Sequence, residues 1–204
     1  MATSELGPTT NCFSTTQLSP LYHYGPVTFI KIHNRYIFVG YGPILHIYQV
    51  DSSASSRRHN NSNNKSNVHL IFKRQVFKRN KIHHVSINSA ARKIIISGGR
   101  SFTVLPLDTV LADAHGGQSE CNFTEMAINE WIITSEILDD GTVLLLNSYN
   151  VVYKITPLSS DTNQRQHYSV EKISCGEKSI LYSGSINVVA SSGEIYIAAG
   201  TVMN

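Results

Sequence analysis

The sequence predicts an all-β fold. Short apolar runs rich in Ile, Val, Phe and Tyr recur along the chain, and turn signals built on Gly, Asn or Asp separate them. No long helical periodicity accompanies these runs, and the best helical candidate is the short stretch Thr109–Ala114. A strand–turn–strand pattern also repeats along the chain. Together these three observations predict antiparallel sheets joined by short turns.

The stretch from Gly25 to Asp51 shows the pattern most clearly. It holds three apolar runs, and the third alternates between the two faces of a strand. We expect the runs to form a meander of three antiparallel strands. The runs are Val27–Ile32, Tyr36–Gly40 and Ile44–Val50, and the turns between them are His33-Asn34-Arg35 and Tyr41-Gly42-Pro43.

Four segments share this shape and recur at intervals of about 50 residues. They are YIFVGYGPILHIYQV, KIIISGGRSFTVLPL, TVLLLNSYNVVYKI and EIYIAAGTVMN, with turn markers at Gly40, Gly98, Asn147 and Gly200. Repeats of this period with several strands each are typical of β-propeller blades, with a β-sandwich as the rival architecture. The fourth unit lacks its last strand. The sequence therefore predicts an incomplete N-terminal propeller of three to four blades, and we expect the chain to be the front of a longer reading frame.

The domain plan follows from these units. Residues 1–18 are polar and are expected to form a flexible N-terminal arm. Residues 19–204 are expected to form the partial propeller, interrupted by a disordered Ser/Asn-rich insertion at 52–67. We place the start of the second unit at Val68, directly after this insertion.

Composition narrows the class of protein. Apolar residues make up 41% of the 204 positions and charged residues 15%, which suits a globular domain. No apolar run is long enough for a transmembrane helix, so no membrane insertion is expected. The chain has three widely separated cysteines, which predict a reducing compartment and a cytoplasmic location without disulfides or zinc spacing.

The positive charge is concentrated in one part of the chain. The net charge is +3, yet eleven of the 17 Lys and Arg residues lie between Ser52 and Leu107, where there is no Asp or Glu. Such asymmetry indicates a polyanionic partner. The alternative is that some of these cations belong to a solvated loop.

The segment KRQVFKRNKIHH, from Lys73 to His84, is the best candidate for an RNA contact. Its cations could neutralise phosphates, and the interleaved Phe77 could stack on a base. An ordinary strand and loop with cations facing water remains the alternative. The candidate RNA-binding residues are Lys73, Arg74, Lys78, Arg79 and Lys81.

No catalytic or metal-binding constellation is visible. Gly40-Tyr41-Gly42 is followed by Pro43 and another strand rather than a helix, so it predicts a turn and not a nucleotide loop. His83 and His84 are neighbours and should point to opposite faces of a strand. Asp139-Asp140 precedes Gly141 in a hairpin turn, and Trp131 is predicted to be a core residue. We expect no catalytic residue, no metal and no cofactor, and therefore no enzyme.

Several segments, in this order, resemble a known family. GPVTFIKIHNRYIFVGYGPILHIYQVD is similar to the opening blade of the large WD-repeat adaptor of the tRNA wobble-position 2′-O-ribose methyltransferase. HLIFKRQVF, KIIISGGRSFTVLPLD, NEWIITSEILDDGTVLLLNSYNVVYKI and the Ile-Ala-Ala-Gly-Thr run follow in the family's order, so the resemblance covers about Ser19 to Asn204.

The resemblance implies a function without chemistry of its own. The chain would be the N-terminal part of a non-catalytic subunit that binds the methyltransferase catalytic subunit and presents the tRNA anticodon loop to it. Yeast members of the family are also linked to endosomal recycling. A protein–protein scaffold that contacts endosomal recycling factors is therefore the alternative function.

Overall fold

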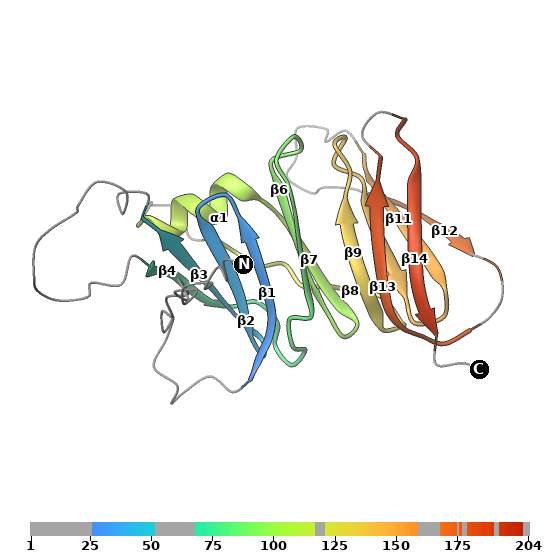
Figure 1. Cartoon of the computed structure of the whole chain (residues 1–204), viewed down its shortest axis with the longest axis horizontal. Coiled ribbons are helices and arrows are strands. Elements are labelled where there is room, and N and C mark those ends of the chain that lie inside the picture. Colours follow the sequence, from blue (N-terminus) through green and yellow to red (C-terminus); the bar gives the residue numbers. More distant parts are fainter. Residues whose placement is uncertain are drawn as a thin grey trace, which may run out of the picture.

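The computed structural model of the chain describes residues 26–51, 68–116, 121–158, 168–174, 176, 179–189 and 192–201. The predicted arm at 1–18 and the predicted insertion at 52–67 lie outside the described residues. Antiparallel strands make up nearly all of the regular secondary structure of the described residues (Figure 1).

Within the described residues, three sheets contain four strands each, and a fourth contains two. The spatial order of the strands follows their order along the chain in every sheet, as in a meander. The first sheet comprises β1 (Val27–His33), β2 (Tyr36–Tyr41), β3 (Ile44–Val50) and β4 (Val68–Gln75). The second comprises β5 (His84–Asn88), β6 (Lys93–Gly98), β7 (Ser101–Pro106) and β8 (Met126–Ala127). The third comprises β9 (Ile132–Ile137), β10 (Val143–Asn147), β11 (Val151–Pro157) and β12 (Tyr168–Ser174), and the last hairpin pairs β13 (Leu181–Val188) with β14 (Ile195–Thr201).

The sheets stand face to face in one row (Figure 1). The first strand of each sheet contacts the first strand of the next, so that β1 lies against β5, β5 against β9, and β9 against β13. Meanders stacked in this way around their inner strands are propeller blades. The predicted fold class is confirmed as three four-stranded blades and one two-stranded blade, and the two-layer sandwich is excluded as its alternative.

The central blades are buried on both faces, which explains their continuous apolar runs. On β6, Ile94 and Ile96 pack in the core shared with the first blade, whereas Ile95 packs in the core shared with the third. On β10, Leu145 faces the second blade and Leu144 faces the last hairpin. A strand covered on both sides has no polar face, so alternation disappears from its sequence.

The four repeated segments correspond to equivalent strands. The first three cover the second and third strands of a blade, namely β2–β3, β6–β7 and β10–β11, and the fourth begins with β14. The predicted turn at Gly40-Tyr41-Gly42 connects β2 to β3, and Gly42 has a φ of 58°. The strand–turn–strand prediction is therefore confirmed for the first three segments. It is wrong for the fourth, because Gly200 lies within β14 and pairs with Ser183.

The predicted start of the second unit is wrong. Val68 begins β4, which pairs with β3 and completes the first blade. The insertion thus separates the third and fourth strands of one blade, and the sequence alone does not show which unit the following strand joins. β8 and β12 were also not predicted. β8 has two residues, and most of β12 is exposed at the outer edge, where no apolar alternation is needed.

The helix α1 (Leu107–Ala114) connects β7 to β8 and begins two residues before the predicted stretch. Its buried residues, Leu107 and Val110, extend the core between the first and second blades. No helix in the described part of the chain has the length and apolar character needed to span a bilayer.

His46 on β3 should make the fold sensitive to acid. Its side chain is fully buried, its ring lies 4.6 Å from that of Tyr41, and its Nδ1 lies 3.2 Å from the hydroxyl of Tyr48. Burial, and then the charge of Lys73, lowers the pKa of His46 from 6.5 to about 4. Between these values the unfolded chain binds a proton that the folded chain does not.

The stabilising effect of neutral His46 is therefore complete above pH 6.5 and is lost as the pH falls toward 4. We expect a loss on the order of 3 kcal/mol over this window from His46 alone. Urea unfolding at several pH values measures it, and His46→Gln should have a shallower pH dependence than the wild type. A variant that is equally sensitive to pH would contradict this role.

Candidate nucleic-acid interface

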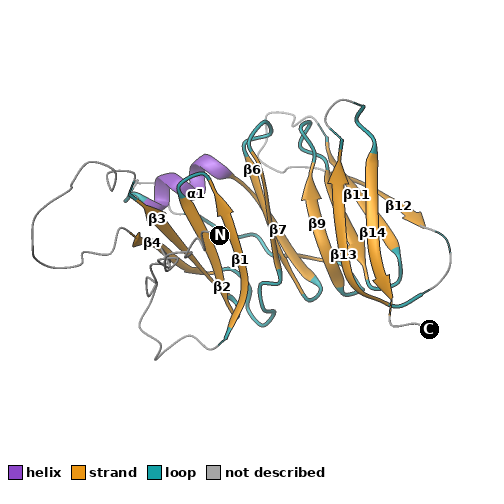
Figure 2. Ribbon diagram, viewed as in Figure 1, coloured by secondary structure: helices purple, strands orange, loops and turns teal. Residues whose placement is uncertain are grey.

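Several connections meet at one end of the blade stack, opposite the end that carries α1 (Figure 2). We call this end the loop face, and it consists of residues 76–83, 98–100, 128–131 and 147–150. Main-chain hydrogen bonds join these segments to adjoining strands and turns, and the bond between Ile132 and Gly99 connects the third blade to the second. They run from Val76 N to Pro43 O (2.9 Å), from His83 N to Ser97 O (2.9 Å), from Ile132 N to Gly99 O (2.7 Å) and from Ser148 N to Trp131 O (2.8 Å).

The connection from β4 to β5 presents three of the predicted RNA-binding residues. Phe77 and Ile82 are fully buried and anchor the segment in the core between the first two blades. The cations between these anchors, Lys78, Arg79 and Lys81, lie at its surface. Because two apolar anchors fix the segment, the exposed cations between them face water or a ligand.

The β6–β7 turn holds this connection at very close range. A Cβ on Gly98 would lie 1.7 Å from the carbonyl oxygen of Lys81 and 3.2 Å from the backbone N of His83. Only a residue without a side chain permits this approach. The position of the cations thus depends on a glycine in the neighbouring turn.

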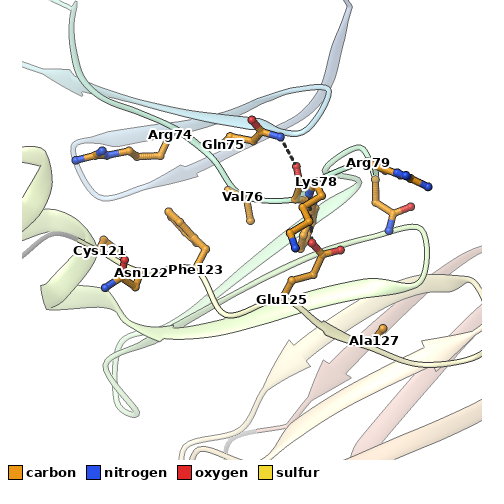
Figure 3. A pocket seen from close by; sticks show the side chains of 12 residues that line it. Arg74, Gln75, Val76, Lys78, Arg79, Cys121, Asn122, Phe123, Glu125 and Ala127 are labelled. Carbon is orange, nitrogen blue, oxygen red and sulfur yellow. Dashed lines mark hydrogen bonds between the residues drawn. The ribbon is translucent and has the colours of Figure 1, made fainter.

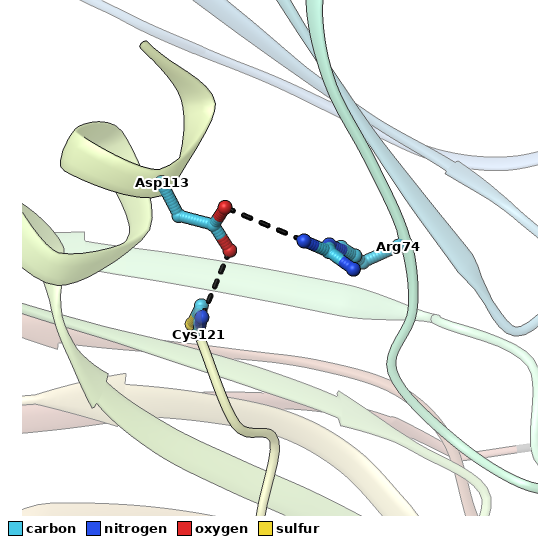
Figure 4. Close-up of polar contacts among 3 residues, drawn as sticks. All are labelled: Arg74, Asp113 and Cys121. Carbon is cyan, nitrogen blue, oxygen red and sulfur yellow. Dashed lines mark hydrogen bonds and ion pairs between the residues drawn. The ribbon is translucent and has the colours of Figure 1, made fainter. Parts of the chain in front are cut away.

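The other two predicted RNA-binding residues, Lys73 and Arg74, lie on β4. Nη2 of Arg74 lies 3.5 Å from Oδ1 of Asp113 on α1, and Oδ2 of Asp113 accepts a hydrogen bond from Cys121 N at 2.9 Å (Figure 4). Arg74 therefore joins β4 to α1 and to the chain that follows it. Lys73 pairs in register with His46 and is exposed. The five predicted residues thus separate into a loop-face group and a β4 group.

A pocket of about 1000 Å³ lies beside the connection, between residues 74–80 and 121–127 (Figure 3). Lys78 and Arg79 line one side, and Glu125 lines the other. The Glu125 carboxylate accepts hydrogen bonds from Lys78 N at 3.2 Å and from the hydroxyl of Ser101 at 2.5 Å. The lining also includes Arg74, so three cations face one carboxylate, and Lys78 and Arg79 border both this pocket and the exposed loop face.

The aromatic residues of the region are arranged differently from the sequence-based prediction. Phe77, the predicted stacking residue, is fully buried and cannot reach a base. Trp131, the predicted core residue, is 48% exposed, and its ring centroid lies 5.8 Å from that of His83. Both interpretations were wrong. Trp131 immediately precedes β9 and lies in a connection, a boundary that hydropathy alone does not locate.

The adjacent histidines have different partners, but only His84 lies in a strand, because β5 begins at that residue. His83 contacts Trp131 on the loop face, whereas His84 contacts the ring of Phe29 at 5.5 Å and the hydroxyl of Ser135 at 3.2 Å. Burial, and then the charge of Lys81, lowers the pKa of His83. Burial, and then Lys31, lowers the pKa of His84 to about 4. Both rings are therefore neutral near pH 7.

Other side chains of the types found in catalytic sites have structural roles or unfavourable surroundings. In the turn between β9 and β10, Asp140 accepts hydrogen bonds from the backbone N and the hydroxyl of Thr142, so the turn interpretation is confirmed. Burial, and then the charge of Asp113, raises the pKa of the Cys121 thiol, which makes it a poor nucleophile. Among the residues that the structure describes, no three His, Cys, Asp or Glu side chains gather as metal ligands would.

Comparison with known proteins gives matches among solved structures alone. No family model matches the chain, and no curated protein matches its sequence. Among solved structures, Hsv2 of Kluyveromyces marxianus is 9% identical with a TM-score of 0.40, covering 88% of this chain and 74% of its own. Hsv2 of Kluyveromyces lactis is 10% identical with a TM-score of 0.36, covering 87% and 73%. The Pan2 WD40 domain of Neurospora crassa is 10% identical with a TM-score of 0.35, covering 90% and 63%. These identities and TM-scores are too low to support a fold assignment. The assignment depends instead on the strand topology of the blades.

Proposed function

We propose that the chain is a non-catalytic WD-repeat scaffold that binds a tRNA 2′-O-methyltransferase and helps to position tRNA for ribose methylation at the wobble nucleotide. The observation that carries the proposal is the row of surface cations, Lys78, Arg79 and Lys81, held between two buried anchors on the loop face. The ordered resemblance of the sequence segments to the adaptor family supports the choice of RNA and of enzyme partner.

The proposed mechanism is positioning. The cations would hold tRNA through its phosphates, which contact a protein independently of base sequence. Blades that share cores on both faces provide a rigid support, so the bound RNA would keep a constant orientation relative to the partner enzyme. The partner would supply the methyl-donor site and all of the chemistry.

Deleting the gene and measuring 2′-O-methylation of tRNA nucleotide 34 tests the proposal. Methylation should disappear in the deletion strain and return with the intact gene, while ribose methylation elsewhere in tRNA serves as the internal control. Affinity capture of the intact protein should also recover the methyltransferase. Normal methylation in the deletion strain would overturn the proposed function.

A protein–protein scaffold in endosomal recycling is the second candidate function. It is favoured by apolar side chains that remain exposed on the two outermost blades, including Ile30 and Ile32 on β1 and Tyr196 on β14. Exposed apolar surface is typical of protein contacts. Recovery of recycling factors without a methyltransferase in the same capture experiment would favour this second function.

A further inference from the structure

Trp131 lies on the loop face, and hydrogen bonds hold the main chain on both sides of it. Its carbonyl oxygen accepts a hydrogen bond from Ser148 N at 2.8 Å, and the next residue, Ile132, donates its N–H to Gly99 O at 2.7 Å. Turns of two blades therefore fix the main chain on either side of the indole. The side chain itself remains 48% exposed. A fixed main chain beneath an open aromatic ring is a preorganised surface for stacking.

The surroundings of the indole combine aromatic and cationic groups. The ring of His83 meets it at 5.8 Å and an interplanar angle of 80°, and Lys81 lies two residues before His83. Tyr149, which is also exposed, follows Ser148 in the β10–β11 turn. The nearest acid in sequence, Glu130, accepts a hydrogen bond from the hydroxyl of Tyr153.

We propose that the Trp131 indole stacks on an unpaired base of an RNA loop whose phosphates contact Lys78, Arg79 and Lys81. Aromatic side chains beside a cationic groove are how proteins hold single-stranded nucleic acid, because every base has a face that can stack. A paired duplex offers the same phosphates but no free base face. The proposal rests on the RNA-binding part of the proposed function and adds the side chain that contacts an unpaired base.

Tryptophan fluorescence provides a direct test, because Trp131 is the only tryptophan in the chain. The intact protein is titrated with an RNA hairpin that carries an unpaired loop, and separately with a fully paired duplex of equal phosphate number. We expect the hairpin to quench the emission at saturation and the duplex to bind more weakly without quenching. Binding of both RNAs with unchanged emission would overturn the stacking proposal while leaving RNA binding intact.

Substitutions of aromatic residues distinguish stacking on RNA from contact with a protein partner. Trp131→Ala should weaken hairpin binding about tenfold and leave duplex binding unchanged, while Trp131→Phe should keep most of the affinity. Tyr196→Ala removes a similarly exposed aromatic side chain from β14 and should change the affinity for neither the hairpin nor the duplex. If no RNA binds, both this inference and RNA binding by the chain are wrong. If Trp131→Ala impairs only methyltransferase capture, Trp131 contacts protein and the inference is overturned.

Discussion

Reversing the three loop-face cations together, as Lys78→Glu, Arg79→Glu and Lys81→Glu, should lower tRNA affinity by about 100-fold at low salt. The physical reason is the loss of three phosphate contacts, followed by repulsion between the new carboxylates and the RNA backbone. The slope of log affinity against log salt should also fall by about 1 for each cation that contacts a phosphate. Filter binding or fluorescence anisotropy across a salt series measures both quantities.

A matched control separates a local contact from a change in net charge. Arg35, Arg92 and Lys172 are also exposed, but they lie in the β1–β2 turn, in the β5–β6 turn and on the outer strand β12. Their replacement by Glu changes the net charge by the same amount, and we expect the salt slope to stay near that of the wild type. An equal loss of affinity in both triple variants would mean that general charge, rather than the loop face, attracts RNA.

Gly98→Ala should destabilise the fold by about 3 kcal/mol, although it adds a single methyl group. The new Cβ would lie 1.7 Å from the carbonyl oxygen of Lys81, so the main chain of the connection would have to move. The hydrogen bond from His83 N to Ser97 O would be disturbed by the same movement. Chemical denaturation measures the loss of stability, and weaker RNA binding should accompany it because Lys81 is displaced.

The control for this variant is Gly42→Asn in the β2–β3 turn. Gly42 has a φ of 58°, but a Cβ at this position would meet no surrounding atom within 4 Å, and Asn tolerates the left-handed region. We expect a cost of about 1 kcal/mol or less. A Gly98→Ala variant as stable as Gly42→Asn would contradict the close packing between the β6–β7 turn and the connection.

Local patterns were sufficient for the inner strands of the blades. Lys93–Ser97 and Thr142–Leu146 are apolar because neighbouring blades cover both their faces, and Tyr36–Gly40 packs on the core shared with the second blade. The turns after these three strands carry Gly or Asn. Such signals depend on a residue and its immediate neighbours. The same reasoning failed for β12, whose residues are mostly exposed at the outer edge, and for the assignment of β4 to a blade, which is decided by pairing with β3 across an insertion.

The candidate site also divides into features that local sequence patterns predicted and features that only packing decided. The sequence identified the cluster of cations, but not that Arg74 is directed to Asp113, because Asp113 is brought close only by the packing of α1. It also could not tell that Phe77 is buried and Trp131 exposed, since both are aromatic residues next to strands. Whether a side chain is exposed depends on the residues that pack against it, and in this fold those residues often come from another blade.

The sequence by itself determined the all-β class, the repeated strand–turn–strand units and the concentration of positive charge between Ser52 and Leu107. These features follow from local hydropathy, turn chemistry and residue counts. Only the tertiary structure decided that Lys78, Arg79 and Lys81 share one face with Trp131, and that Gly98 permits their approach. The reason is that blade stacking joins turns that are far apart in the chain, and contacts between them leave no signal within either turn.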